Sequence, residues 1–200
     1  NYFCLSQSPN IDMQLVLDLL DKDWDWHSLS CNPSITMENI ESHPDLPWDY
    51  DGIATNSNIT IVFFEKNRKL FGRRRLSWIN LSRNPSIPLE FMVKNMYYLW
   101  RWEYLYDNPR VTVDALMAHP EIASKWNLYG MSDNINTNMD TVLKYNYSDW
   151  AWWKLSKHPN ITADDILHHP ELPWEWDNVS DNPNLTMDVI KRYPDKSWDW

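Results

Sequence analysis

The residues that could carry chemistry in this chain are its histidines, acidic side chains and two cysteines, and their spacing matches none of the familiar catalytic or metal-binding motifs. The sequence contains no HExxH pattern, no CxxC pair, no Walker loop and no GxSxG segment. Its three glycines are too few to build a phosphate-binding loop. We therefore expect a non-enzymatic protein with no catalytic residue, metal or cofactor.

The cysteines and histidines are interpreted as structural residues. Cys4 and Cys31 lack the spacing of a zinc site or of a disulfide-rich framework, so we expect two free thiols. His43, His119 and His169 precede prolines where helices should end, and a helix C-terminus favours a histidine. Free thiols suggest a cytosolic history, whereas six N-x-S/T sequons favour the opposite view. Four of those sequons arise from repeated sequence elements.

Acidic residues stand between paired aromatic residues, where they could serve as ligands or catalytic carboxylates. These acids are Asp25, Asp49, Glu175 and Asp199. The equivalent positions elsewhere hold Ser77, Arg101, Asn127 and Ala151. A solvated outer face explains such variation better than a reactive site does.

The tryptophans could be stacking platforms for sugars or bases. An aromatic residue at a fixed repeat position more often packs between copies, where each ring buries on the order of 200 Å². We favour the packing role. A carbohydrate-binding array that uses exposed tryptophan rings is kept as the alternative function.

The elements that position these residues are eight copies of a unit of about 24 residues, of which Leu155 to Asn178 is the clearest. The copies begin near Leu5, Leu29, Ile53, Leu81, Leu105, Met131, Leu155 and Val179. Residues 1–200 are therefore predicted to form a single repeat domain. Both ends interrupt a copy, so we expect a window of a longer array.

The first half of each copy predicts a short helix that ends before a proline or an equivalent turn. Thr36 is the expected N-cap in the second copy, and Pro44 ends the helix. The other expected caps are Asp12, Thr60, Thr112, Asn138, Thr162 and Thr186, with Pro88 as the exception. The twelfth position of every copy is apolar. We predict a repeat core that includes Ile40, Trp48, Leu116, Trp150, Ile166, Trp174 and Ile190.

The second half of each copy predicts another short helix, with Pro47 at its first position in the second copy. Aromatic residues two positions apart, such as Trp48 and Tyr50, point about 200° away from each other on an α-helix. One ring of each pair should therefore pack between layers, and the other should lie against the neighbouring copy or outside.

Charge is unevenly distributed. The net charge of -10 makes a general nucleic-acid-binding surface improbable. The third copy nevertheless contains a basic segment, which consists of Lys66, Arg68, Lys69, Arg73, Arg74 and Arg75. This basic segment could dock an acidic protein, a phosphate-rich ligand or another copy of the array, or it could be a solvated insertion loop. No apolar run is long enough to span a membrane.

The pattern LS-x-NP-x-IT followed by a short helix and PWDW, as in Leu155 to Trp176, resembles tandem-repeat proteins that are abundant in giant DNA viruses of amoebae. The period and the NP turn are also similar to leucine-rich variant repeats. The resemblance implies an all-α, right-handed α-solenoid and a location in the virion or host cytoplasm. We expect a non-enzymatic scaffold that binds a protein partner or neighbouring copies, with no small-molecule substrate, no membrane span and no nucleic acid unless the basic segment binds it.

Overall fold

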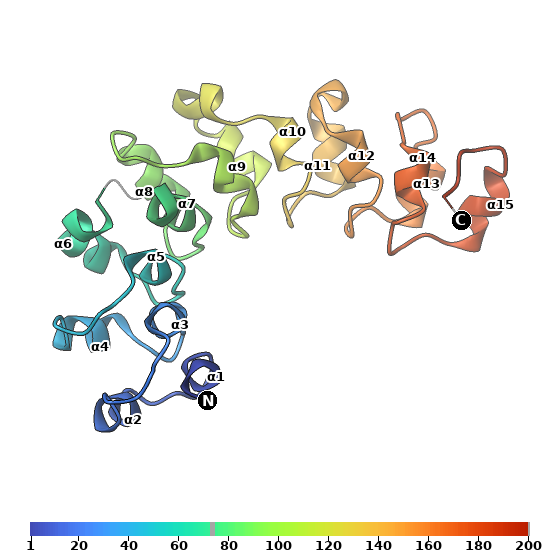
Figure 1. The fold of residues 1–200 in the computed structure, drawn as a ribbon. Coiled ribbons are helices and arrows are strands. Elements are labelled where there is room, and N and C mark those ends of the chain that lie inside the picture. The colour runs from blue at the N-terminus through green and yellow to red at the C-terminus, as the bar shows by residue number, and fades with distance from the viewer. Residues whose placement is uncertain (73–74, 200) are drawn as a thin grey trace. The chain divides into compact units, whose positions relative to one another are not determined.

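The fold was analysed in a computed structural model, which describes residues 1–72 and 75–199. Short α-helices and 3-10 helices follow one another, and the described residues contain no β-strand (Figure 1). The all-α class predicted from the sequence is confirmed. The chain divides into two compact units, Asn1–Asn108 and Pro109–Trp200.

The first unit contains two sets of helices. The helices are α1 (Tyr2–Ser6), α2 (Met13–Asp18), α3 (Trp26–Cys31), α4 (Met37–Ser42), α5 (Tyr50–Ile53), α6 (Ile61–Phe71), α7 (Arg75–Arg83), α8 (Leu89–Lys94) and the 3-10 helix η1 (Trp102–Asp107). Helix α3 contacts α1 and α5, and α7 contacts α5 and η1. The second helix of each copy therefore packs against its counterpart in the next copy, while α2, α4 and α6 lie along the other side of this row (Figure 1).

The second unit repeats the alternation with more irregular turns. Its helices are α9 (Val113–Met117), η2 (Pro120–Lys125), α10 (Leu128–Met131), α11 (Met139–Lys144), η3 (Tyr147–Asp149), α12 (Trp152–Leu155), α13 (Ala163–His168), α14 (Trp176–Val179) and α15 (Met187–Arg192). The 3-10 helices η2 and η3 occur in the fifth and sixth copies. Helices α13 and α15 contact each other, which matches the spacing of one copy.

The first helix of every copy begins where the sequence indicates. All seven predicted polar caps occupy N-cap positions, and Pro88 caps α8 without a side-chain hydrogen bond. Thr36 Oγ1 accepts the backbone N–H of Asn39 at 3.2 Å, and Asn39 Oδ1 accepts the N–H of Thr36 at 2.9 Å. This capping box satisfies two N–H groups at the helix start. Helices of five or six residues need neighbours to be stable.

The second helix begins later than predicted. In the second copy α5 starts at Tyr50, and Asp49 is its N-cap in an extended conformation. The prediction that Pro47 begins this helix is wrong, because the Asp49 carboxylate caps the N–H of Asp51 at 3.0 Å and so fixes the start two residues further on. Trp48 therefore precedes the helix, and its ring is not constrained to oppose Tyr50 across a helical turn.

In six copies a tryptophan of the aromatic pair donates to the C-terminus of the preceding helix. Trp48 Nε1 donates to the carbonyl oxygen of His43, the C-cap residue of α4, at 2.8 Å. The same contact to a C-cap carbonyl is made by Trp24, Trp78, Trp100, Trp174 and Trp198. The last carbonyls of a helix lack partners within the helix. Each of these indoles therefore supplies a missing donor as well as apolar area.

The rings also connect neighbouring copies. Trp26 meets Trp48 edge to face, with ring centroids 5.2 Å apart and planes at 86°. Trp152 and Trp174 repeat this arrangement at 5.1 Å and 88°. Edge-to-face contacts are favourable for aromatic rings. The indoles thus form part of the packing between copies.

The predicted core residues lie inside the fold with one exception. Ile40, Trp48, Leu116, Trp150, Ile166 and Trp174 are buried. Ile190 is only half-buried, and Val189 beside it is fully buried instead. Ile190 belongs to α15, in which Val189 takes the buried position, so the side chain of Ile190 is not fully covered.

Buried asparagines connect successive copies through the backbone. Asn56 Nδ2 donates to the carbonyl oxygens of Ser30, Asn32 and Ile35 at 3.0, 2.9 and 3.0 Å. In the first unit Asn32, Asn84 and Asn108 likewise reach the second and fourth residues of the preceding copy. Asn182 does so in the second unit. We call these side chains the asparagine ladder. They satisfy carbonyls that burial would otherwise leave without a donor.

A serine hydroxyl makes the second recurring link. Ser30 Oγ accepts the backbone N–H of Asp49 at 2.9 Å, so α3 holds the start of α5. Equivalent pairs are Ser6 with Asp25, Ser82 with Arg101, Ser132 with Ala151, Ser156 with Glu175 and Ser180 with Asp199. The residue between the two aromatics is therefore fixed through its backbone, whatever its side chain. This explains why that position varies so widely.

Candidate functional site

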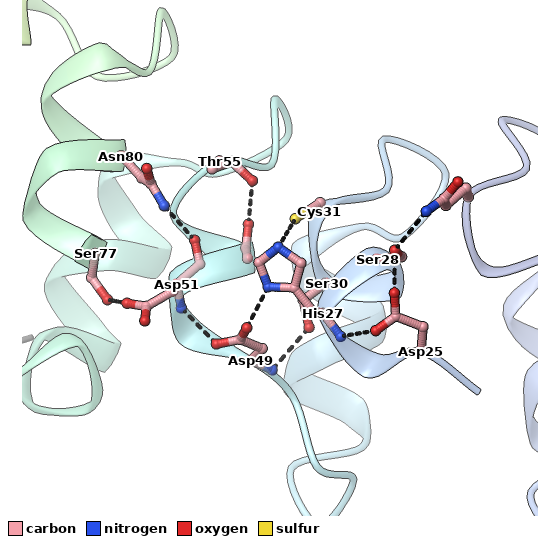
Figure 2. A network of polar contacts seen from close by, with 12 residues as sticks. Asp25, His27, Ser28, Ser30, Cys31, Asp49, Asp51, Thr55, Ser77 and Asn80 are labelled. Atoms are coloured by element: carbon pink, nitrogen blue, oxygen red, sulfur yellow. Dashed lines mark hydrogen bonds and ion pairs between the residues drawn. The ribbon is translucent and has the colours of Figure 1, made fainter. Parts of the chain in front are cut away.

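A cysteine, a histidine and an aspartate meet between α3 and α5. His27 and Cys31 are one turn apart on α3, and Asp49 precedes α5 (Figure 2). The imidazole Nε2 of His27 lies 3.6 Å from Cys31 Sγ, and its Nδ1 lies 2.5 Å from Asp49 Oδ2. A nucleophile, a base and a group that orients the base thus stand in sequence. We call these three residues the thiol cluster.

Hydrogen bonds from the backbone hold both aspartates near the cluster. Asp49 is fixed by the N–H of Asp51 and by its own N–H to Ser30. Asp25 Oδ1 accepts the N–H of His27 at 3.2 Å, and its Oδ2 accepts the Ser28 hydroxyl at 2.5 Å. Asp25 and Asp49 are N-caps rather than members of a purely solvated face, and this corrects the sequence-based interpretation. A carboxylate at a helix start is favoured by the helix dipole.

A glycine allows the two helices to approach. A Cβ atom at Gly52 of α5 would lie 2.9 Å from the carbonyl oxygen of His27 and from Cβ of Ser30, and 3.2 Å from Cys31 Sγ. Contacts of 2.9 Å are too close for a side-chain carbon. The absence of a side chain at Gly52 is therefore what brings the start of α5, and with it Asp49, against α3.

The environment shifts the pKa of two members of the cluster in opposite directions. Burial raises the pKa of the Cys31 thiol, and the charges of Asp49 and Asp25 raise it further against a hydrogen bond with Thr55. Burial by itself would raise the pKa of Asp49 as well. The hydrogen bond with His27 and the N–H groups of Asp51 and Gly52 outweigh it and lower the pKa of Asp49. The pair therefore combines an ionised carboxylate with a protonated thiol near neutral pH.

An open cavity adjoins the thiol. It has a volume of about 410 Å³ and is lined by Gln7, His27, Ser28, Cys31, Asn32 and Pro33. Gln7 Nε2 donates to the Ser28 hydroxyl at 3.4 Å. The cavity thus offers a thiol, an imidazole and an amide to a small molecule. Cys4 is exposed, and Cys31 is half-buried; both are free thiols, as predicted.

The basic segment is partly engaged within the chain. Lys66 forms an ion pair with Glu41 at 2.9 Å, and Arg68 donates to the Tyr98 hydroxyl at 2.8 Å. Lys69 is exposed at the end of α6. Arg73 and Arg74 lie outside the described residues, as does the side chain of Arg75. Burial and a hydrogen bond with Tyr97 are the first causes that raise the pKa of Tyr98 to about 12, so its hydroxyl stays protonated beside Arg68.

Exposed tryptophan rings are scarce in the described part of the chain. Trp153 is the tryptophan with a large exposed fraction, 42%. The amines of Lys154 and Lys157 each lie 5.3 Å from its ring centroid. The tryptophans at repeated positions are buried or half-buried. Among residues 1–72 and 75–199, the tryptophan face most open to a sugar is therefore that of Trp153, which the lysines already flank.

The thiol cluster was not predicted from the sequence, although the spacing of two of its three residues is informative. His27 and Cys31 are four residues apart, a spacing that places them on one helical face. Asp49 comes from the next copy, 22 residues after His27, and only the stacking of α5 on α3 brings it near. Among the described residues no set of three or more histidine, cysteine, aspartate or glutamate side chains is arranged to hold a metal ion.

None of the helices in the described ranges has the length and apolar character that a membrane crossing requires. Comparisons of the chain with family models, curated proteins and solved structures find no match.

Proposed function

We propose that this chain is a non-enzymatic scaffold that binds another protein, and that its copies stack as a right-handed α-solenoid. The proposal is supported by a division within each copy between buried residues that link the copies and surface residues that vary. Buried Asn56 and Ser30 make the same links as their counterparts elsewhere, so the stack is specified by a few repeated positions. The remaining surface positions vary, as expected where a scaffold presents residues to a partner.

The surface of α6 is the best-supported binding face. Val62, Lys66 and Lys69 are exposed and follow the i, i+4, i+7 spacing of one helical face. Val62 is 77% exposed. Exposed apolar side chains beside cations suit a partner with an acidic rim and an apolar centre. A shallow cavity of about 220 Å³, lined in part by Tyr50, Lys66 and Leu70, adjoins this face.

Charge reversal tests this assignment. The variant K66E/K69E should fail to retain a protein that the wild type binds. Added salt should weaken the wild-type complex as well, because it screens the same charges. The control K125E/K191E changes charge equally at exposed residues of the second unit and should bind normally. Affinity purification with quantitative mass spectrometry, followed by titration with the purified partner, measures both. Equal binding by all three proteins, or a small-molecule ligand without a protein partner, would refute the proposal.

Binding of a different protein must be distinguished from self-association, because the acidic surface of a second copy could bind the α6 face that carries Lys66 and Lys69. Sedimentation velocity of the wild type and K66E/K69E distinguishes them. A giant-virus particle or assembly in the infected cytoplasm remains the proposed setting, and it rests on the repeat pattern alone. The carbohydrate alternative now depends on Trp153. Tryptophan fluorescence that is unchanged by a glycan panel would exclude it.

A further inference from the structure

We propose that Cys31 is a nucleophile that accepts an acyl group from a small activated ester or thioester, with His27 as its base and Asp49 as the positioning residue. This chemistry goes beyond the scaffold role and does not depend on it. The inference stands on the order of contacts in the thiol cluster (Figure 2) and on the cavity that opens beside the sulfur.

The contacts orient the imidazole toward the thiol. The ionised carboxylate of Asp49 can only accept, so the 2.5 Å contact places a proton on Nδ1 of His27. The unprotonated Nε2 then faces Cys31 Sγ at 3.6 Å, a usual separation for a bond that involves sulfur. Such contacts tighten when a substrate is bound. A fixed tautomer is what allows a histidine to remove the proton of a nucleophile.

A base is needed at this position because the thiol does not ionise readily. Its burial and the negative charges of Asp25 and Asp49 raise the pKa of Cys31. The thiolate is the reactive form of cysteine, so transfer of the proton to Nε2 must accompany attack. The charged groups that act on the thiol are Asp25, the N-cap of α3, and Asp49, the N-cap of α5. Gln7, the C-cap residue of α1, contributes its neutral amide to the cavity.

The step balances within the cluster and the acyl donor. The Sγ lone pair attacks the carbonyl carbon while Nε2 of His27 takes the thiol proton, and an oxyanion forms. Collapse of this intermediate breaks the bond to the alkoxide or thiolate leaving group, which takes the proton back from His27. Cys31 is left as a thioester. The Gln7 amide donates to the Ser28 hydroxyl and lines the same cavity as Cys31, and we assign its second N–H to the oxyanion.

Single-turnover acetylation by p-nitrophenyl acetate tests the proposal. The assay uses the full chain with Cys4→Ser, so that one thiol remains. We expect one equivalent of p-nitrophenolate and one acetyl group on Cys31, as seen by intact mass and peptide mapping. His27→Ala should slow acetylation by about 100-fold or more, the usual contribution of a general base. Cys31→Ser/Cys4→Ser should show no rapid release.

Asp49→Asn tests the positioning role of Asp49 without removing the helix cap. Asparagine caps helices as well as aspartate does, so α5 should form, while the tautomer of His27 is no longer fixed. We expect slower acetylation and a changed pH profile. With Asp49 and His27 present, acetylation should proceed even where the thiol is still protonated, because His27 removes the proton during attack. Without His27, the rate should follow the ionisation of the thiol alone. Asp12→Asn alters the N-cap of α2 and should leave rate and profile unchanged.

Circular dichroism and the melting temperature of each variant confirm the fold. The proposal fails if Cys31 reacts no faster than Cys4 in the otherwise unmodified chain. It also fails if folded His27→Ala and Asp49→Asn proteins acetylate at the parent rate with the parent pH profile.

Discussion

The imidazole of His158 stands where other copies place an asparagine amide, and it donates from Nε2 to the carbonyl oxygen of Asn134 at 3.2 Å. Its Nδ1 accepts the N–H of Asn160 at 3.1 Å. Asn182 makes the equivalent bonds one copy later, to His158 and from the N–H of Asn184. One donor and one acceptor at fixed places define a neutral ring with its proton on Nε2. His158 therefore takes the place of an asparagine in the asparagine ladder.

The burial of His158 makes stability depend on pH. Burial lowers the pKa of His158 in the folded chain, whereas the unfolded value is about 6.5. Between the two values only the unfolded chain binds the proton, so stability is fully present above pH 6.5 and is lost as the pH falls toward the folded value. The loss should approach about 1.4 kcal/mol per pH unit.

His158→Asn is the matched control for this titration. Asparagine can make both bonds and does not ionise, so the variant should keep more of its stability between pH 6.5 and 5 than the wild type. Urea unfolding at several pH values measures the difference. Parallel pH dependence of the two proteins would show that His158 does not carry the effect.

The indole N–H contribution can be isolated with two tryptophans. Trp48 is buried and donates to His43, whereas Trp150 is buried and its Nε1 has no partner among the described residues. Phenylalanine removes a similar area at both sites. Trp48→Phe should therefore cost about 1 kcal/mol more free energy of unfolding than Trp150→Phe. An equal or smaller cost for Trp48→Phe would argue against helix capping by the indole.

The approach of α5 to α3 should be sensitive to a single methyl group. Gly52→Ala places a Cβ 2.9 Å from the backbone oxygen of His27. Backbone cannot move as a flexible side chain does, so we expect a loss of about 1–3 kcal/mol. Thermal unfolding measures it. The same shift should separate Asp49 from His27, so Gly52→Ala should also slow the acetylation of Cys31. An unchanged melting temperature would contradict the close contact.

Much of the fold could be predicted because local chemistry determines it. Thr36 and its counterparts cap helices through bonds that span three residues, and such signals are complete within one copy. The apolar twelfth position also indicates burial, with Ile190 as the exception. The prediction that the second helix starts at Pro47 is wrong because Asp49, which is the N-cap, has the appearance of a solvated acidic residue in the sequence. Its importance depends on the N–H of Asp51 and on Ser30 of the preceding copy.

The thiol cluster could not be predicted either, because it too depends on contacts between different copies. His27 and Cys31 share a face by helical geometry, but the third member arrives by stacking. Asp49 and Asp25 both stand between two aromatic residues, and the feature that differs, Gly52 after Asp49, indicates close packing only once α5 is placed against α3. The ladder role of asparagine was equally hidden. Asn32 reads as a turn residue, and its bonds to Ser6 and Ser8 become visible only when copies are placed together.

Repeated side-chain hydrogen bonds to the backbone of the neighbouring copy hold these short helices in place. Asn56 provides three such bonds from a fully buried position. At about 1 kcal/mol for each bond, Asn56→Ala should lose about 3 kcal/mol. Asn10→Ala removes an exposed amide outside the ladder and should change stability little.

Urea unfolding of the wild type, Asn56→Ala and Asn10→Ala, followed by circular dichroism and tryptophan fluorescence together, tests this claim most directly. A midpoint that falls markedly for Asn56→Ala alone is the predicted result. Equal midpoints for Asn56→Ala and Asn10→Ala would contradict it, because the stack would then be held by apolar contact without the ladder.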